Sequence, residues 1–403
     1  MSSSPRAPGG AFSIVCVSPQ EWDADLPTNR QQIMRRAAER GHDVVFVESG
    51  SFLWRRPGRL LRAPLKEARR RLRGEAVAER LRVRSALTFV PWGKRYELAS
   101  RINFALTRRM LRRALKRLPQ PSILWIYDPA AAALAGSVGE AFAVYDCVDD
   151  YAEQYAPDAR RMALVAAADK EAARRSRLVF ATTEPLAERH RAFNANTHVV
   201  PNVADYAHFS RAADPQLAAP DVRELPYPVI GFAGNLSADK VDFSLLEALA
   251  AARADWTLLL VGPARPGTDA AIGRLRALSN VRWLGWKPYD QLPRYMAAFD
   301  VGLCPYLANA YTRNVFPLKV YEYLAAGKPV VATGTPALAG MEPDVVVADG
   351  ASSLLAAVET MLTRSSRADR ERRMKLAAGH TWEHRTERLL ELIAAELDRG
   401  RDR

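Results

Sequence analysis

The stretch Asn314-Val-Phe-Pro-Leu-Lys-Val-Tyr-Glu-Tyr-Leu-Ala-Ala-Gly-Lys-Pro-Val-Val-Ala-Thr333 combines a helix start, a helix stop and a strand. Pro317 has a restricted φ angle and no N–H group, so it suits the first position of a helix. Gly327, followed by Pro329, ends such a helix, and residues 330–331 are typical of a short buried strand. The stretch therefore predicts one helix-to-strand unit of an α/β fold.

Two charged residues of this predicted helix, Lys319 and Glu322, are three positions apart and project from roughly one face. The unpaired N–H groups at a helix N-terminus attract phosphate, and Lys319 adds a full positive charge beside them. Glu322 can accept hydrogen bonds from the two hydroxyls of a ribose. The pair therefore predicts a site for a nucleotide diphosphate. The simpler alternative is a solvent-exposed ion pair, which is common and contributes little.

The same stretch resembles the donor-site signature of GT-B glycosyltransferases of the family 4 type, which use nucleotide sugars. That signature has two glutamates separated by seven residues. Glu322 matches the second, whereas Asn314 stands in place of the first, which usually meets the sugar. Some polysaccharide-assembling relatives resemble this chain in having Pro-x-Lys before the remaining acid, as Pro317 and Lys319 are placed here. The resemblance implies the GT-B fold, with two doubly wound, Rossmann-like α/β domains that face a cleft.

Length and composition agree with a globular protein of two domains. The chain has 403 residues, of which 48% are hydrophobic and 26% are charged. No apolar run approaches the roughly 20 residues of a membrane span, and the first ten residues lack the core of a signal peptide, so we expect a cytoplasmic location. Cys16, Cys147 and Cys304 have neither CxxC nor His spacing, which argues against disulfides and zinc and favours buried thiols.

The positive charge of the chain is concentrated in residues 55–117. This segment has 21 Lys and Arg against 4 Asp and Glu, a net charge of +17, so the remainder of the +13 chain carries −4. Helical spacing is found in residues 65–72 and 105–118, with Leu111, Leu115 and Leu118 on one face. A basic helix packed on its domain and docking to an anionic membrane surface are both compatible with this pattern. The aromatic residues suited to a headgroup layer are Trp54, Trp92 and Tyr96.

Nucleic-acid binding is disfavoured, because the sequence has no helix-turn-helix, zinc or RNA-sheet motif. A metal site is disfavoured as well. Asp23-Ala-Asp25 has the Asp-x-Asp form that binds a metal diphosphate in another glycosyltransferase fold, but it does not follow a mid-domain strand. We therefore predict no metal and no nucleic-acid partner.

The N-terminal half begins with strands at 12–17 and 43–48 around a helix at 30–40, a βαβ unit that requires a parallel sheet. Further strands at 122–127 and 143–148 are followed by Asp128 and by Asp149 and Asp150. Ligands bind beyond the carboxyl ends of parallel strands, and an aspartate there can take the proton of an attacking hydroxyl. The resemblance places Asp149 and Asp150 at the catalytic pair of the family; helix capping is the alternative.

In the C-terminal half, a predicted strand at 228–234 runs into Gly234, whose backbone can approach a ligand. The resembled family follows this glycine with an Arg and, five residues later, a Lys that contact the donor diphosphate. Asn235 and Lys240 occupy these positions here. The nucleotide base would be read near Trp286, and the loop at 306–314 would address the sugar. The donor-binding residues implied by the resemblance are Gly234, Asn235, Lys240, Trp286, Asn309, Arg313, Asn314, Pro317, Lys319 and Glu322.

The resemblance also implies a domain plan. We expect an acceptor-binding domain at 11–205 with a basic helical insertion at 55–118, a linker at 206–226 and a nucleotide-sugar-binding domain at 227–378. A last helix at 379–398 is expected to cross back to the first domain.

The expected reaction is transfer of a hexose, with UDP or GDP as the carrier, to a hydroxyl of a lipid-linked saccharide or surface polysaccharide precursor. The donor is a substrate, and no cofactor is expected. Lys319 and Lys240 would stabilise the leaving diphosphate without a metal. The basic segment suggests peripheral contact with an anionic membrane at the inner face of a bacterial envelope. Two alternatives are a nucleotide-sugar epimerase of the same fold and an inactive nucleotide-sugar-binding protein, the latter suggested by Asn235 and Asn314.

Overall fold

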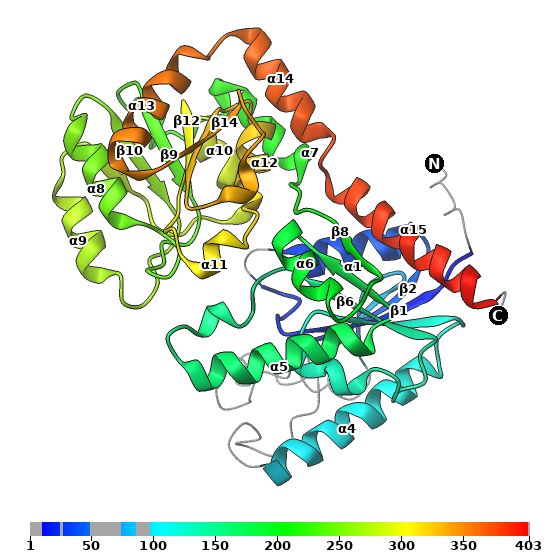
Figure 1. Cartoon of the computed structure of the whole chain (residues 1–403). Helices are drawn as coiled ribbons and strands as arrows, with labels where there is room; N and C mark the ends of the chain where they lie inside the picture. Colours follow the sequence, from blue (N-terminus) through cyan, green and yellow to red (C-terminus); the bar gives the residue numbers. More distant parts are fainter. Residues whose placement is uncertain (1–9, 25–26, 49–73, 86–96, 402–403) are drawn as a thin grey trace. The chain divides into compact units, whose positions relative to one another are not determined.

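The computed structural model describes residues 10–24, 27–48, 74–85 and 97–401. The chain divides into two compact units (Figure 1): unit 1 comprises residues up to Val200 together with Thr386 onward, and unit 2 comprises Pro201–Arg385. The predicted helix at 65–72, the rings of Trp54, Trp92 and Tyr96, and Asp25 lie outside the described residues.

Unit 1 is built on a sheet with the strand order β3-β4-β2-β1-β5-β6-β7-β8. Neighbouring strands pair in parallel, except for the antiparallel pair β3 and β4 at the edge. The central strands are continuous apolar runs that are buried on both faces, as parallel sheets require. The strands are β1 (Ser13–Ser18), β2 (Asp43–Glu48), β3 (Glu75–Ala78), β4 (Leu81–Ser85), β5 (Ser122–Ile126), β6 (Phe142–Cys147), β7 (Leu178–Ala181) and β8 (Thr197–Val199).

The main helices of unit 1 are α1 (Asn29–Glu39), α4 (Glu97–Leu115), α5 (Ala159–Arg175), α6 (Glu184–Arg191) and the larger part of α15 (Trp382–Arg401). Helix α1 begins at Thr28, which forms a capping box with Gln31, and the β1-α1-β2 unit confirms the predicted βαβ element. Helix α4 buries Leu111 and Leu115. Its exposed arginines, Arg108, Arg109, Arg112 and Arg113, confirm a basic amphipathic helix, but the helix ends at Leu115, so Leu118 of the predicted face lies beyond it. No helix in the described ranges is long and apolar enough to cross a membrane.

Unit 2 has a second sheet, all parallel, with the order β11-β10-β9-β12-β13-β14. Val229 and Ala233 of β9 belong to one buried apolar cluster, and the alternate residues Ile230 and Phe232 belong to another. Because alternate residues of a strand point to opposite faces, helices cover both faces of this sheet. The strands are β9 (Val229–Ala233), β10 (Thr257–Val261), β11 (Val281–Trp283), β12 (Val301–Pro305), β13 (Val330–Thr333) and β14 (Val345–Ala348).

The helices of unit 2 are mostly short (Figure 1). They are α7 (Tyr206–Phe209), α8 (Phe243–Ala252), α9 (Asp269–Ala277), α10 (Leu292–Met296), α11 (Ala310–Arg313), α12 (Leu318–Ala325), α13 (Gly350–Thr363) and α14 (Arg367–Ala378). Helices α8 to α12 lie between successive strands, α7 precedes the first strand of the unit, and α13 and α14 follow the last.

The helix-to-strand stretch at 314–333 forms α12 and β13, as predicted, with one shift. Pro317 is not the first helical residue but the N-cap before α12, because its ψ of 123° is extended while its φ is −69°. Gly327, with a φ of 71°, ends the helix.

Residues 206–226 also differ from the expected linker. They form α7 and short turns, and apolar side chains such as Phe209, Ala212 and Val222 are buried in the core of unit 2. Burial of this apolar surface ties the segment to that unit.

Candidate active site

Three glycines lie at the carboxyl ends of neighbouring strands in unit 2. Gly234 follows β9, Gly262 follows β10, and Gly285 follows β11 by two residues. The N–H of Gly234 donates to Val261 O (2.8 Å), and the N–H of Gly262 donates to Gly285 O (2.8 Å). A Cβ atom on Gly262 would lie 1.9 Å from Gly234 O, so only glycine permits this approach. Backbone groups thus line the edge where parallel sheets bind ligands.

Lys319, the second residue of α12, extends over this edge. A Cβ atom on Gly234 would lie 2.2 Å from Lys319 Cε and 2.4 Å from Lys319 Nζ, so the ammonium group occupies the space that the missing side chain leaves. The ammonium also lies 5.5 Å from the centroid of the Phe232 ring. Lys319 is half-buried and forms no ion pair with a described residue. Its positive charge is therefore available to an anionic ligand at the end of β9.

Glu322 lies one turn further along α12 and is half-buried. Burial raises the pKa of its carboxyl to about 7; the charge of Lys319 opposes this shift and that of Asp205 reinforces it. Within the described chain, Lys319 and Glu322 do not form the solvent-exposed ion pair that was the simpler alternative. A carboxyl with a pKa near neutrality can be ionised by ligand hydroxyls that donate hydrogen bonds to it.

Lys240 is presented by a loop that is tied to the loop after β12. Its ammonium lies 4.7 Å from the centroid of the Tyr311 ring, and its carbonyl accepts from the N–H of Leu307 (2.8 Å). Asn309 caps α11 by accepting from the N–H of Thr312 (2.9 Å), and it donates to Asp239 O (3.0 Å). The side chain of Asn309 therefore links the loop that carries Lys240 to the loop after β12.

The other predicted donor residues lie on segments that leave the same edge of the sheet. Trp286 follows Gly285 and is 51% exposed. Arg313 is exposed at the end of α11, and Asn314 is half-buried and donates to Ala310 O (3.4 Å). Asn235 is half-buried directly after Gly234. Contacts thus join Gly234 to Lys319 and Asn309 to the Lys240 loop, and the strand order brings the remaining residues to this edge.

The two predicted catalytic aspartates of unit 1 differ in their surroundings. Asp150 is 2% exposed, and its Oδ2 lies 2.8 Å from Nη1 of Arg189. Asp149 is half-buried, and its carbonyl accepts from the thiol of Cys147 (3.4 Å). Helix capping is instead the role of Asp128, which accepts from the N–H of Ala130 (3.0 Å). Asp149 is the better candidate for a base, because Asp150 is held in an ion pair.

Arg30, in the first turn of α1, is a candidate that sequence reasoning missed. Its Nη2 donates to the hydroxyl of Tyr151 (3.1 Å) and its Nη1 to Oε1 of Gln20 (3.2 Å). The guanidinium also lies over the ring of Tyr127, 5.3 Å from the centroid. Gln20, Tyr127 and Tyr151 follow β1, β5 and β6, so Arg30 lies at the carboxyl ends of three adjacent strands. In a chain with 58 Lys and Arg, no local pattern distinguishes this arginine.

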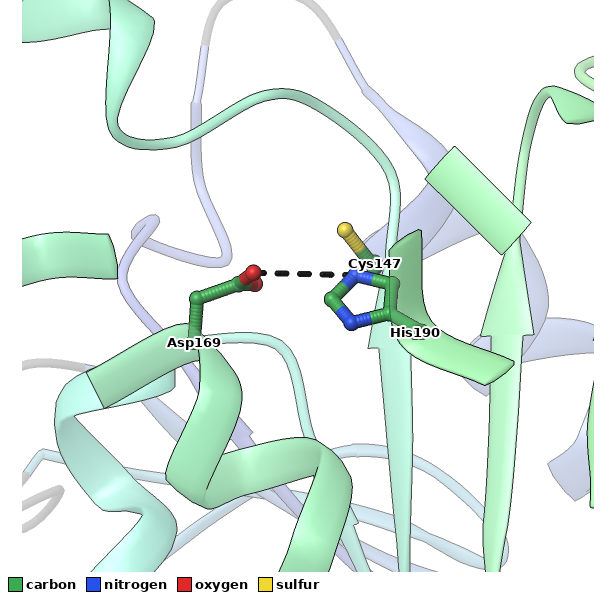
Figure 2. A group of neighbouring side chains, drawn as sticks. All are labelled: Cys147, Asp169 and His190. Atoms are coloured by element: carbon green, nitrogen blue, oxygen red, sulfur yellow. Dashed lines mark ion pairs between the residues drawn. The ribbon is translucent and has the colours of Figure 1, made fainter. Parts of the chain in front are cut away.

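Figure 2 shows a buried cluster of Cys147, Asp169 and His190, whose ligand atoms lie within 4.8 Å of one another. Tyr145 donates to Oδ1 of Asp169 (2.5 Å), and Oδ2 of Asp169 lies 3.7 Å from Nε2 of His190. Burial raises the pKa of the Cys147 thiol and lowers that of His190. Both groups are thus held neutral, and the cluster packs beside the turn that carries Asp149. Cys16, Cys147 and Cys304 are buried free thiols, as predicted.

The family model described as glycosyl transferases group 1 matches residues 227–364, which include the glycine-lined edge, Lys319 and Glu322. Residues 227–364 of this chain are thus similar to a glycosyl transferases group 1 domain. A Bacillus subtilis (strain 168) protein named as a teichuronic acid biosynthesis glycosyltransferase, TuaH, is 36% identical over 193 residues, which are 46% of this chain and 47% of that protein. The 2-deoxystreptamine glucosyltransferase of Streptomyces kanamyceticus is 31% identical over 138 residues, 32% of this chain and 34% of that enzyme. The chain thus spans about half the length of these curated relatives, or less.

Solved structures resemble the chain over almost its whole length. Sucrose-phosphate synthase from Thermosynechococcus elongatus has a TM-score of 0.70 at 16% identity, covering 96% of this chain and 99% of that one. Anabaena HepE in complex with UDP has a TM-score of 0.65 at 16% identity, covering 96% and 100%. At these identities the likeness shows the fold, which is GT-B with two Rossmann-like units.

Proposed function

We propose that this protein is a glycosyltransferase whose donor is a nucleotide-diphosphate sugar bound by unit 2. The single observation that carries the proposal is the position of Lys319, whose ammonium fills the space above Gly234 at the glycine-lined end of β9. Lys319, a cation that forms no ion pair with a described residue, suits a diphosphate at this edge, and Glu322 on the same helix suits the ribose hydroxyls. The group 1 match over 227–364 supports the same assignment.

The chemistry assigned to unit 2 is electrostatic. When the bond between the sugar and the diphosphate breaks, negative charge develops on the diphosphate. Lys319 and Lys240 stabilise this charge without a metal. The nucleotide base binds near Trp286. The diphosphate and the sugar are contacted by Asn235, Arg313 and Asn314. A hexose is the transferred group. UDP is the favoured carrier, because HepE, which shares the fold, has been solved with UDP and with UDP-glucose.

Unit 1 binds the acceptor, and Asp149 takes the proton of the attacking hydroxyl. The acceptor is a lipid-linked saccharide or a growing surface polysaccharide, which is supported by the similarity to TuaH, named for teichuronic acid biosynthesis. The enzyme acts at the anionic inner face of a bacterial membrane, and the exposed arginines of α4 support this part of the proposal.

Donor binding is the first test. Thermal unfolding is measured with UDP-, GDP-, ADP- and TDP-sugars in the absence of metal. A donor at about 100 times its Kd stabilises the protein by roughly 2.7 kcal/mol. We expect one nucleotide to stabilise the wild type and not Lys319→Ala. The matched control is Lys375→Ala, an exposed lysine of α14, which should respond like the wild type. Absence of any shift at saturating donor would remove the donor assignment.

The inactive binding protein is the second candidate, favoured by Asn235 and Asn314 at two positions where the resembled family has charged residues. Both candidates predict donor binding, so turnover separates them. Slow release of free sugar and nucleotide diphosphate from the bound donor supports the transferase. An isomeric nucleotide sugar, seen by NMR, would indicate an epimerase, and a donor that stays intact would indicate a binding protein.

A further inference from the structure

The guanidinium of Arg30 is oriented by groups from four segments of unit 1. Gln20 and Thr28 accept from Nη1 (3.2 and 3.4 Å), Tyr151 accepts from Nη2 (3.1 Å), and the ring of Tyr127 packs against the planar group. The side chain is half-buried, and its Nε–H is buried without a hydrogen-bond acceptor among the described residues. An arginine held in this way has lost much of its rotamer freedom before any ligand arrives.

All of these recorded partners are neutral. Arg30 makes no ion pair with a described carboxylate, whereas Arg189 pairs with Asp150 and Arg177 with Glu396 in the same unit. Asp149 acts on Arg30 through its charge, but it is not within ion-pair distance. Keeping a half-buried cation without an anionic partner costs free energy, and an anion from solution would offset that cost.

The position of this cation fits a binding role. Its partners follow β1, β5 and β6, so the guanidinium lies over the carboxyl ends of the central strands, where parallel sheets bind ligands. Asp149, the candidate base, is the second residue after β6, and Tyr151 is the fourth. A ligand group held by Arg30 would therefore be close to the residue that activates the attacking hydroxyl.

We propose that Arg30 binds an oxyanion of the acceptor, either a phosphate or a carboxylate. The planar fork of its N–H groups matches both anions in bidentate geometry. This inference rests on the proposed function only in assigning acceptor binding to unit 1. It makes the acceptor an acidic molecule: a sugar phosphate or phosphate-linked lipid in one case, and a uronic acid in the other.

Calorimetric titration of the full chain tests the proposal. The parent is Lys319→Ala, so that the donor site does not take up the added anions. The probes are inorganic phosphate, pyrophosphate and glucuronate, with glucose as the neutral probe, all at constant ionic strength. Arg30→Gln removes the charge and keeps a planar amide. The matched control is Arg35→Gln, which removes an exposed arginine of the same helix that lies over the Trp22 ring, 5.8 Å from its centroid.

We expect one oxyanion to bind the parent and the Arg35→Gln variant equally, and Arg30→Gln to bind it at least about tenfold more weakly, since charge-assisted hydrogen bonds are lost. Binding of the phosphates alone identifies a phosphate-bearing acceptor, and binding of glucuronate identifies a uronic acid. If Arg30→Gln does not fold, Arg30→Lys keeps the charge and should still weaken binding severalfold, because the fork is lost. The proposal is overturned if no oxyanion binds, or if binding is independent of Arg30. Neither result affects the donor-binding test, which measures stabilisation by nucleotide sugars bound to unit 2.

Discussion

The ammonium of Lys319 lies 2.4 Å from the point where a Cβ atom on Gly234 would be, so the lysine of α12 and the glycine after β9 are sterically coupled. The two residues are 85 positions apart in the chain. This coupling explains why a glycine at the end of β9 suits a lysine at the start of α12. The donor assignment can therefore be tested by substituting the glycine.

Gly234→Ala should displace Lys319 and weaken donor binding. The new Cβ atom would overlap Lys319 Cε and Nζ, and alanine is also strained at the Gly234 φ of 156°. We expect the stabilisation by the matching nucleotide sugar to be largely lost, corresponding to about 1.5–3 kcal/mol of charge-assisted hydrogen bonding. The measurement is donor affinity by calorimetry.

The control for this change is Gly273→Ala, since a Cβ atom there meets nothing within 4 Å and the residue lies in α9. It should stabilise the fold by roughly 0.5–1 kcal/mol and leave donor affinity unchanged. Equal donor affinity in Gly234→Ala and Gly273→Ala would argue against a role for Lys319.

Donor binding should strengthen as pH rises through about 7. Burial raises the pKa of Glu322 to about 7 from an ordinary value of 4.5, and ribose hydroxyls donate to the ionised form. Below this pKa a proton must be lost on binding, so the affinity should fall by up to about tenfold per pH unit. Titrations at several pH values check this.

Glu322→Gln should flatten the pH profile, while Glu371→Gln, an exposed control on α14, should preserve it. The unliganded protein has the opposite dependence. Because the folded pKa of Glu322 is raised, its contribution favours the folded state at low pH and is lost as pH rises from about 4.5 to about 7. A donor affinity that does not change across this window would contradict a ribose-binding carboxylate.

Substitution of Asp149 should affect catalysis, whereas substitution of Asp150 should affect stability. Asp149→Asn should lower kcat by about 10²–10⁴-fold with little change in melting temperature, since general-base catalysis contributes on this scale. Asp150→Asn should lower the free energy of unfolding by about 1–3 kcal/mol, because it breaks the buried side of the ion pair with Arg189. Steady-state kinetics and thermal unfolding of both variants provide the comparison. An unchanged kcat in Asp149→Asn would point to a mechanism without an enzymic base.

Helix α4 should bind anionic membranes. Exchange of its exposed arginines for glutamine should reduce co-sedimentation with vesicles that contain phosphatidylserine, at about 1 kcal/mol per charge, and the binding should weaken with salt. The exchanged residues are Arg108, Arg109, Arg112 and Arg113. A control variant exchanges four exposed arginines of unit 2, namely Arg274, Arg276, Arg367 and Arg370. Equal losses in the two variants would mean that net charge, rather than α4, drives binding, and neutral phosphatidylcholine vesicles set the baseline.

Local chemistry was sufficient to predict the elements and the fold class. Pro317 and Gly327 act on their own backbone and immediate neighbours, so they mark the ends of α12 to within one residue. The apolar runs of β1 and β2 signal strands buried on both faces, and the helix between them requires parallel pairing. The motif that contains Lys319 and Glu322 could be read in the same way, because its residues are close in sequence.

Burial and long-range pairing could be read only from the tertiary structure. The pKa of Glu322 is raised by the residues that pack around α12. The alanine-rich segment at 206–226 is buried because its apolar side chains pack into the core of unit 2. Arg30 meets Tyr151 across 121 positions. Asp150 meets Arg189 across 39. A sequence pattern records periodicity within a segment, but which charges meet is decided only when helices such as α1 and α6 pack on the sheet.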